Sequence, residues 1–191
     1  MRPGLAIIGL WVAFFASWLL AAGWSSSVEK SVGVRGELGF RIVLILGALV
    51  LAVPAHGYVG PLRLWFVTRN EAWAGAAVMV CGFAFAWWAR IRLGALWSGQ
   101  ITRKTDHRLI DSGPYAIVRH PIYSGILLAV YATAAVKGTI PGAAGALIIT
   151  IGIWMKARRE ESWLGRQLDA NAYLAYCRRV PMLVPFGPKA R

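Results

Sequence analysis

Long uncharged blocks alternate with short basic segments along the chain, and this pattern predicts helices that cross a membrane. A transmembrane helix needs about 20 mainly apolar residues. Residues 5–24 meet that requirement without a charge, and two further apolar blocks follow at residues 38–55 and 72–89. Arg41 lies near one end of the second block, from which its long side chain can reach the headgroups. We therefore expect three transmembrane helices in the first half of the chain.

The first block has a second interpretation, because a signal peptide also combines a basic start with an apolar run. Arg2 would be the basic start, and the small residues near Ala22 would be the cleavage site. The block is long for a signal peptide, and it contains three Trp residues, which favour the membrane interface. A retained helix is therefore the preferred interpretation.

Two shorter apolar runs, residues 122–136 and 139–155, are separated by only a few residues. They predict a helical hairpin whose tip, Lys137-Gly138, reaches the opposite surface. Pro121 suits the first turn of a helix, where its missing N–H costs nothing. The pattern as a whole predicts an all-α, polytopic membrane protein with about five transmembrane helices, the last two of them paired as this hairpin.

The C-terminal tail mixes apolar and basic positions. Between residues 161 and 180, the aromatic and leucine side chains alternate with three arginines, Arg166, Arg178 and Arg179. This mixture predicts an amphipathic helix at the membrane interface. We expect Pro181 and Pro185 to end it.

The distribution of charge orients the helices. Net charge is +13, yet only 15% of the residues are charged, against about a quarter in soluble proteins. Six Lys and Arg residues lie in segment 90–120 and eight in the tail 156–191, whereas the loop 56–71 holds two. Because cytoplasmic loops carry the excess of Lys and Arg, both basic segments are expected in the cytoplasm and the N-terminus outside. No nucleic-acid-binding motif accompanies the charge, so nucleic acid is not an expected partner.

Candidate chemistry is confined to two polar segments. The sequence has no Walker loop, no GxSxG or HExxH motif and no Rossmann fingerprint. Its two cysteines, Cys81 and Cys177, have no metal-binding spacing and predict no disulfide framework. The segments 94–123 and 156–161 hold enough polar groups and are predicted on the same side of the membrane. A cofactor is therefore expected to bind where these segments meet.

These segments resemble a known family. The stretch LGALWSGQITRKTDHRLIDSGPYAIVRHPIYSGILL, followed by KARREESWLGRQLDANAYLAYCRRVPMLVPF, is similar to the isoprenylcysteine carboxyl methyltransferase family of integral-membrane enzymes, which is related to phospholipid N-methyltransferases. The resemblance covers about residues 90–186 and depends on the motifs HxLI, GPY, RHPxY and EExxL in this order. It implies S-adenosylmethionine as the cofactor, S-adenosylhomocysteine as its product, and no metal site.

The resemblance also implies a cofactor pocket formed by the cytosolic loop and the C-terminal interfacial helix. Matching the motifs residue by residue gives these cofactor-binding positions: Gln100, His107, Arg108, Leu109, Ile110, Tyr115, His120, Pro121, Ile122, Tyr123 and Glu160. Eukaryotic members have an Arg, proposed to meet the substrate carboxylate, where this chain has Lys156. The lysine keeps the charge but loses the two-point contact. Lys156 is therefore the expected acceptor contact, and no residue is assigned as a catalytic acid or base.

Each of these residues has a simpler interpretation when taken alone. The histidines also suit turn and capping positions, and the tyrosines suit anchoring at the membrane interface. Glu160 and Glu161 suit neutralisation of Arg158 and Arg159, and Lys156 suits contact with lipid phosphates. Only the ordered combination of motifs favours a cofactor site.

The expected function is S-adenosylmethionine-dependent methylation of a lipophilic or prenylated acceptor that arrives from the bilayer, most simply at a carboxylate. A phospholipid amine or a small thiol is the alternative acceptor. A non-enzymatic transporter or scaffold is disfavoured, because the predicted spans place almost no ionisable groups in the middle of the membrane. The expected organisation is an N-terminal pair of helices, 1–71, and a methyltransferase core, 72–191, made of the helix 72–89, the cofactor loop 94–123, the hairpin 122–155 and the amphipathic segment 156–186.

Overall fold

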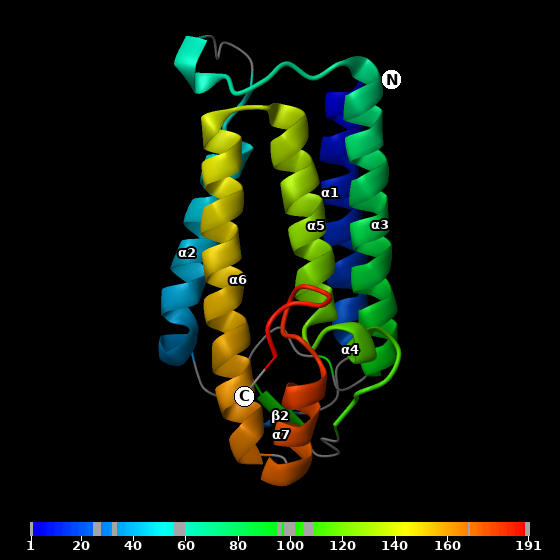
Figure 1. The fold of residues 1–191 in the computed structure, drawn as a ribbon, viewed down its shortest axis with the longest axis vertical. Helices are drawn as coiled ribbons and strands as arrows, with labels where there is room; N and C mark the ends of the chain where they lie inside the picture. Colours follow the sequence, from blue (N-terminus) through cyan, green and yellow to red (C-terminus); the bar gives the residue numbers. More distant parts are fainter. Residues whose placement is uncertain are drawn as a thin grey trace.

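A bundle of long helices forms the body of the protein in this computed structural model (Figure 1). The structure describes residues 2–24, 28–31, 34–55, 60–94, 97, 102–104, 109–167 and 169–189. The long helices are α1 (Pro3–Leu20), α2 (Val34–Ala52), α3 (Arg69–Leu93), α5 (Pro121–Lys137) and α6 (Ile140–Gln167). The shorter elements are η1 (Ala21–Trp24), β1 (Val28–Ser31), η2 (Gly60–Leu62), β2 (Thr102–Lys104), α4 (Pro114–Ile117) and α7 (Ala170–Arg179). The predicted all-α class is confirmed, with one small sheet added.

Successive long helices run in opposite directions, so the loops gather at the two ends of the bundle (Figure 1). The turn between α5 and α6 lies at one end, as the predicted hairpin requires. At the other end lie α4, β2 and α7, together with the last turns of α6 (Figure 1). The described parts of the two polar segments that the sequence predicts on one side therefore lie at the same end of the bundle.

Among the residues that the structure describes, three helices are long and apolar enough to cross a membrane, by their length and composition: Pro3–Gly23, Arg69–Leu93 and Ile140–Arg166. Helix α5 is also apolar but shorter. Large apolar side chains on α1 face outward, among them Leu5, Val12 and Leu19, each more than 60% exposed. A continuous apolar surface of this kind suits contact with lipid.

Helix α6 does not end with its apolar run. It continues through the polar residues from Lys156 to Gln167, so that apolar and polar parts form one rigid element. The predicted C-terminal helix, α7, forms separately after Asp169, whose side chain accepts a hydrogen bond from the amide of Ala172. Glu160, the acid expected at the cofactor pocket, thus belongs to the same helix as the last predicted span.

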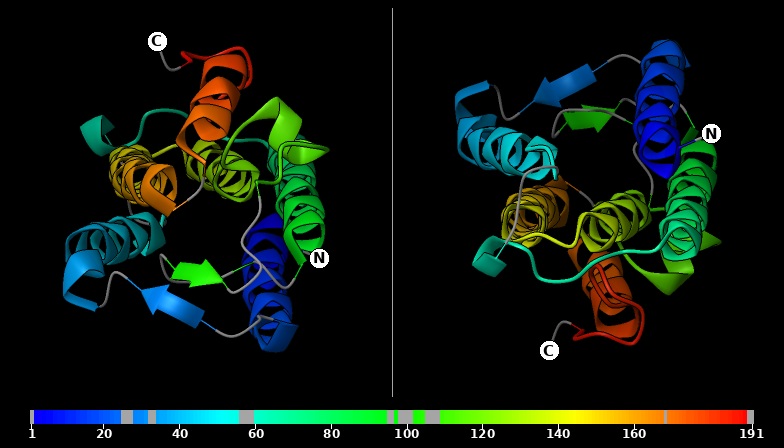
Figure 2. Two further views of the ribbon diagram at one scale, coloured as in Figure 1. Left: turned by 90° about the horizontal axis from the view of Figure 1, so that it is seen from below. Right: turned by 90° about the horizontal axis from the view of Figure 1, so that it is seen from above.

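The small sheet was not expected from the sequence. Strands β1 and β2 pair antiparallel, with Val28 opposite Lys104 and Ser31 opposite Thr102. Seen along the bundle axis, the sheet and α7 lie on opposite sides of α5 and α6 (Figure 2). The sheet therefore closes the polar end of the bundle on the side of α1 and α2.

Glycines set the closest contacts between the long helices. Helix α3 packs along α5, and a Cβ atom built on Gly125 would lie 2.3 Å from the carbonyl oxygen of Gly82. Helix α2 packs along α6, and a Cβ atom on Gly145 would lie 2.5 Å from the amide nitrogen of Leu51. Small residues at such crossings let membrane helices approach backbone to backbone.

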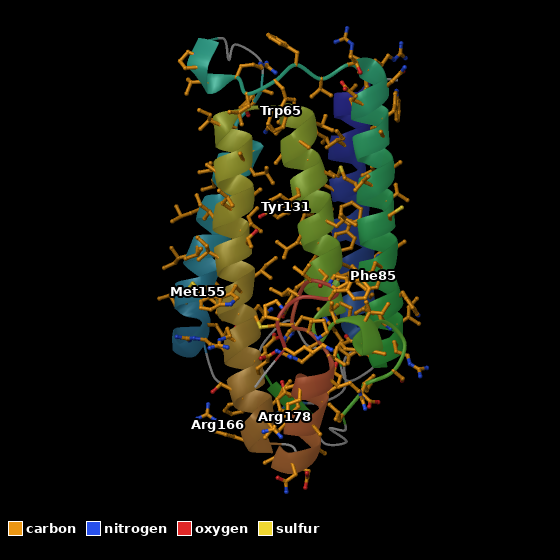
Figure 3. All side chains as sticks on the ribbon, viewed as in Figure 1. Trp65, Phe85, Tyr131, Met155, Arg166 and Arg178 are labelled. Carbon is orange, nitrogen blue, oxygen red and sulfur yellow. The ribbon has the colours of Figure 1, made fainter. Side chains whose placement is uncertain are left out.

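The hairpin tip is held to two other parts of the chain. Gly138 adopts a positive φ of 57°, and a Cβ atom there would lie 2.4 Å from the carbonyl oxygen of Trp65, so only glycine fits. The ring of Trp65 lies against this end of the hairpin (Figure 3) and donates a hydrogen bond to the carbonyl of Ala135. Lys137 donates from its ammonium to carbonyls at the end of α2, including that of Leu51.

We expect Gly125→Ala to destabilise the bundle, because the added methyl group would collide with the backbone of α3. Overpacking of this kind typically costs about 1–3 kcal/mol. The matched control is Gly9→Ala on α1, where an added Cβ meets nothing within 4 Å and the better helix propensity should hold or raise stability. Thermal unfolding in detergent measures both variants, and equal melting temperatures for the two would contradict the proposed contact.

Candidate functional site

Two adjacent carboxylates lie at the end of the bundle where α6 passes the start of α5. The side chains of Glu160 and Glu161 are only 18% and 15% exposed. The buried ring of His120 lies between them: Nδ1 is 3.5 Å from Glu160 Oε2, and Nε2 is 3.2 Å from Glu161 Oε1. Charges withdrawn from water need partners of opposite charge or hydrogen-bond donors. One imidazole serves both carboxylates.

The protonation of His120 follows from this position. Burial disfavours the charged ring, but the hydrogen bonds and charges of Glu160 and Glu161 outweigh burial, so the pKa of His120 is raised. A protonated imidazole donates from both nitrogens. The doubly protonated form of His120 is therefore the one that matches its two carboxylate neighbours.

Tyr123 completes the surroundings of Glu160. Its hydroxyl donates to Glu160 Oε1 at 2.6 Å, and its ring stacks on that of His120, with centroids 5.5 Å apart and planes 9° apart. Pro121 is the first residue of α5, as predicted, and starts the helix so that Tyr123 lies within its first turn. The RHPxY motif thus places an aromatic ring and a phenol hydroxyl beside the first carboxylate of EExxL.

Lys156 lies one turn before Glu160 on α6. Its Nζ is 3.9 Å from Glu160 Oε1 and 5.4 Å from the centroid of the Tyr123 ring. The same Nζ is 5.8 Å from the centroid of Phe40, a buried residue of α2. The expectation that Lys156 and Glu160 share one face of the helix is met by these distances.

Helix α2 contributes side chains to this site, in addition to its place in the bundle. Phe40 is 2% exposed, and Glu37, one turn earlier, is 1% exposed and accepts a hydrogen bond from Arg41 Nε at 3.0 Å. Neither residue was predicted from the sequence. A single Phe in an apolar block carries no signal that separates a site residue from one that faces lipid.

Arg119 joins the C-terminal segment to the site through hydrogen bonds. Its Nε donates to Glu161 Oε1 at 2.7 Å, and its guanidinium donates to the carbonyls of Cys177 and Val180 at the end of α7. Its own amide donates to the carbonyl of Pro181. The sequence suggests that Glu161 neutralises the arginines on its own helix. In the structure it pairs with Arg119 instead, and the RHPxY motif that contains this arginine was the signal that could have indicated the contact.

Tyr115 lies in the short helix α4 and is buried. Its carbonyl accepts a hydrogen bond of 2.8 Å from the hydroxyl of Tyr176 on α7, which ties the GPY motif to the C-terminal helix. Burial raises the pKa of the Tyr115 hydroxyl, and Tyr176 and Glu160 raise it further. The phenol therefore stays neutral near the carboxylates.

The residues predicted for the site fall into four groups. His120, Tyr123, Lys156 and Glu160 contact one another directly. Leu109 packs against the apolar face of α7, and Ile110 follows it in the same segment, outside any helix or strand. Tyr115, Pro121 and Ile122 lie on α4 and the first turn of α5, beside this cluster. Gln100, His107 and Arg108 lie outside the described residues.

The side chains of this cluster suit two kinds of ligand group: a cation with aromatic parts, and an anion with an apolar tail. Glu160 presents a carboxylate flanked by the rings of Tyr123 and His120, and Lys156 adds a cation on the side of the apolar helices. Aromatic faces beside a carboxylate attract cationic groups. A lysine at the border of an apolar bundle attracts an anion attached to an apolar tail. The arrangement therefore suits two ligands that meet at Glu160 and Lys156.

Comparison with known proteins agrees with this arrangement. A family model described as phospholipid methyltransferase matches residues 70–171, from the first turn of α3 into α7. Protein-S-isoprenylcysteine O-methyltransferase B of Arabidopsis thaliana is 28% identical over 132 residues, which cover 69% of this chain and 61% of that relative. The chain thus matches less than two thirds of the length of this relative.

The matched segment holds the cluster on α5 and α6 but neither α1 nor α2. The resemblance to membrane methyltransferases inferred from the motifs is confirmed by both comparisons. Because the family model covers more than half of the chain, and with it the residues around Glu160, the chain belongs to the phospholipid methyltransferase family.

Proposed function

We propose that this protein transfers a methyl group from S-adenosylmethionine to a carboxylate on a lipophilic acceptor at the membrane, leaving S-adenosylhomocysteine. The observation that carries the proposal is the contact of Glu160 with Tyr123, His120 and Lys156 inside the segment that matches the family. The isoprenylcysteine O-methyltransferase similarity favours a prenylated carboxylate as the acceptor.

The chemistry of the donor set fits this cofactor. S-adenosylmethionine, when bound, supplies a methyl group activated by a positively charged sulfur. Glu160 offers a carboxylate for an ammonium or ribose hydroxyl, and Tyr123 offers an aromatic face for a cation. The other residues proposed to hold the cofactor are those of the matched motifs: Gln100, His107, Arg108, Leu109, Ile110, Tyr115, His120, Pro121 and Ile122.

The role of the chain in the reaction is to align and to exclude water. A carboxylate acceptor carries its own nucleophilic charge, so no side chain has to remove a proton from it. His120 and Tyr123 fix the carboxylate of Glu160, and Lys156 holds the anionic end of the acceptor beside it. Correct alignment of two reactants in a dry site is the main contribution expected for a displacement of this kind.

The proposed location follows from the helices and the charges. We infer a multi-pass membrane protein in which the acceptor arrives from the bilayer and the cofactor from the cytoplasm. The basic tail and the segment before α5 lie at the end of the bundle that carries Glu160 (Figure 1). The excess of Lys and Arg at this end favours its placement in the cytoplasm.

A phospholipid amine is the second candidate acceptor, because the family model that matches the chain bears that description. An amine has to lose a proton before or during transfer, whereas a carboxylate does not. Labelled methyl transfer to phosphatidylethanolamine and to an amine-blocked S-farnesylcysteine, measured with the purified protein, distinguishes the two acceptors. Product only from the phospholipid would replace the proposed carboxylate with the amine.

Glu160→Gln is expected to weaken the binding of S-adenosylmethionine about tenfold or more, since a hydrogen bond to a charged group contributes about 1.5–3 kcal/mol. Glu161→Gln is the matched control. Its carboxylate is engaged by Arg119, so the change should lower the melting temperature more than the affinity. Calorimetry and thermal unfolding separate the two effects, and an unchanged affinity for Glu160→Gln would remove this residue from the cofactor site.

Lys156→Met is expected to raise the KM for a carboxylate acceptor or to lower turnover, because the anion loses its partner. Lys156→Arg should retain activity, since a guanidinium can bind a carboxylate at two points. Initial rates with amine-blocked S-farnesylcysteine provide the measurement. The control is Arg158→Met, a neighbouring cation whose guanidinium lies over the ring of Trp154 instead. Full activity of Lys156→Met would argue against the acceptor contact.

The raised pKa of His120 predicts that stability depends on pH. A group with a raised pKa in the folded protein stabilises it below its unfolded pKa of about 6.5, and this contribution is lost as pH rises through the folded value. The melting temperature should therefore fall as pH increases above about 6.5. His120→Gln should flatten this part of the profile. The same slope in both proteins would show that another group is responsible.

A further inference from the structure

Three side chains from three helices form a cage around one positive charge. The cage consists of the rings of Phe40 from α2 and Tyr123 from α5, and the carboxylate of Glu160 from α6. The ammonium of Lys156 occupies it, at 5.8 Å and 5.4 Å from the two ring centroids and 3.9 Å from Glu160 Oε1.

The position of Lys156 is unusual for a lysine near the end of an apolar helix. Such a side chain normally extends outward, so that its ammonium reaches water or lipid phosphates. Here the side chain turns inward and is only 15% exposed. Aromatic faces and a carboxylate around a desolvated cation are the arrangement by which proteins bind quaternary ammonium and related ligands.

The residues of the cage overlap with those proposed to hold the cofactor. Glu160 Oε1 is the atom to which Tyr123 donates and the one nearest to Lys156 Nζ. A second cation that approached this carboxylate and these rings would be repelled by the ammonium, and repulsion is strong where water is scarce. Only one cation at a time can therefore contact both rings and the carboxylate of the cage.

We propose that the ammonium of Lys156 and the charged sulfur of S-adenosylmethionine compete for the cage formed by Phe40, Tyr123 and Glu160. This inference rests on the proposed function. The lysine neutralises Glu160 before the cofactor binds, and the incoming cation displaces it toward the acceptor side. Lys156 is then available to pair with an anionic acceptor only after the cofactor is in place, which makes cofactor binding precede acceptor binding.

The charges also account for the end of the cycle. In the transfer, an acceptor carboxylate oxygen bonds to the methyl carbon, the carbon–sulfur bond breaks, and its electron pair remains on sulfur. Carboxylate and sulfonium both become neutral, and no proton is moved. The cage then lacks a cation, so Lys156 returns to Glu160, and the ester no longer has a charge that holds it to the lysine.

The test compares charged and neutral ligands that differ little in shape. The full chain, purified in detergent, is titrated by calorimetry with three ligands. These are S-adenosylmethionine, sinefungin, which has a charged amine in place of the methylated sulfur, and S-adenosylhomocysteine, which is neutral there. Lys156→Met should bind both cationic ligands about three- to tenfold more tightly, the range expected for one cation–aromatic contact. Its affinity for S-adenosylhomocysteine should change by less than about twofold.

Three further variants make the result specific. Lys156→Arg keeps the charge and should retain the wild-type ratio of affinities for charged and neutral ligands. Arg158→Met removes a positive charge from the same helix outside the cage and should also retain that ratio. Phe40→Leu removes one ring of the cage and should weaken the two cationic ligands more than S-adenosylhomocysteine. It tests the cage independently of Lys156.

The outcomes separate this inference from the proposed function. If none of the three ligands binds to the wild-type protein, the proposed function is wrong, and the inference falls with it. If all bind but Lys156→Met changes charged and neutral ligands equally, only the competition is overturned. Weaker binding of all three to that variant would likewise overturn it, because Lys156 would then hold a part that they share, such as the amino-acid carboxylate.

Discussion

The contact between His120 and the two carboxylates of α6 is the interaction on which the arrangement of the polar end depends. Neighbouring residues of a helix point about 100° apart, so Glu160 and Glu161 face different surroundings. The imidazole reaches both because its two nitrogens lie on different sides of the ring. Through Glu160 it fixes Tyr123, and through Glu161 it meets Arg119, which holds the end of α7. Without this bridge, two largely shielded carboxylates would lose the donor that they share, and Glu160 would lose its link to the Arg119–Glu161 pair.

The bundle has two tightly packed pairs of helices, which are joined by a buried apolar cluster between α5 and α6 and by polar contacts. Glycine-mediated approach brings α3 to α5 and α2 to α6. One polar contact lies in the middle of α5 and α6, where the hydroxyls of Tyr131 and Thr150 are 3.0 Å apart. Tyr131 points from α5 toward α6 in Figure 3. The site therefore lies at a seam between pairs, where side chains rather than close backbone contact determine the geometry.

Much of the fold could be predicted from the sequence, because uncharged blocks of this length have few other structures available to them. The five long helices, the hairpin tip and the start of α5 at Pro121 all follow from that pattern. Glu160 and its relation to Lys156 could be predicted from motif order and helix periodicity. These features depend on local sequence, which a single chain displays directly.

The parts that could not be predicted depend on contacts between distant segments. Phe40 looks like any apolar residue of a membrane helix until α2 is placed against α6. Glu161 pairs with Arg119, whereas the guanidinium of Arg158, on its own helix, lies over the ring of Trp154. The pairing of β1 with β2 also joins segments far apart in the chain and has no distinctive alternation in sequence. Periodicity indicates which face of an element is apolar but not which partner covers it.

The lysine at the hairpin tip has a mechanical consequence for α2. Because Lys137 binds carbonyls at the C-terminal end of α2, that end cannot slide along α6 without the hairpin. At the opposite end of α2, the ring of Phe40 lies 5.8 Å from Lys156 Nζ on α6. Together with the close approach of Leu51 to Gly145, the anchor at the hairpin tip fixes the height of α2 against α6. The tip thereby sets the level at which Phe40 meets Lys156, although the two sites lie at opposite ends of α2.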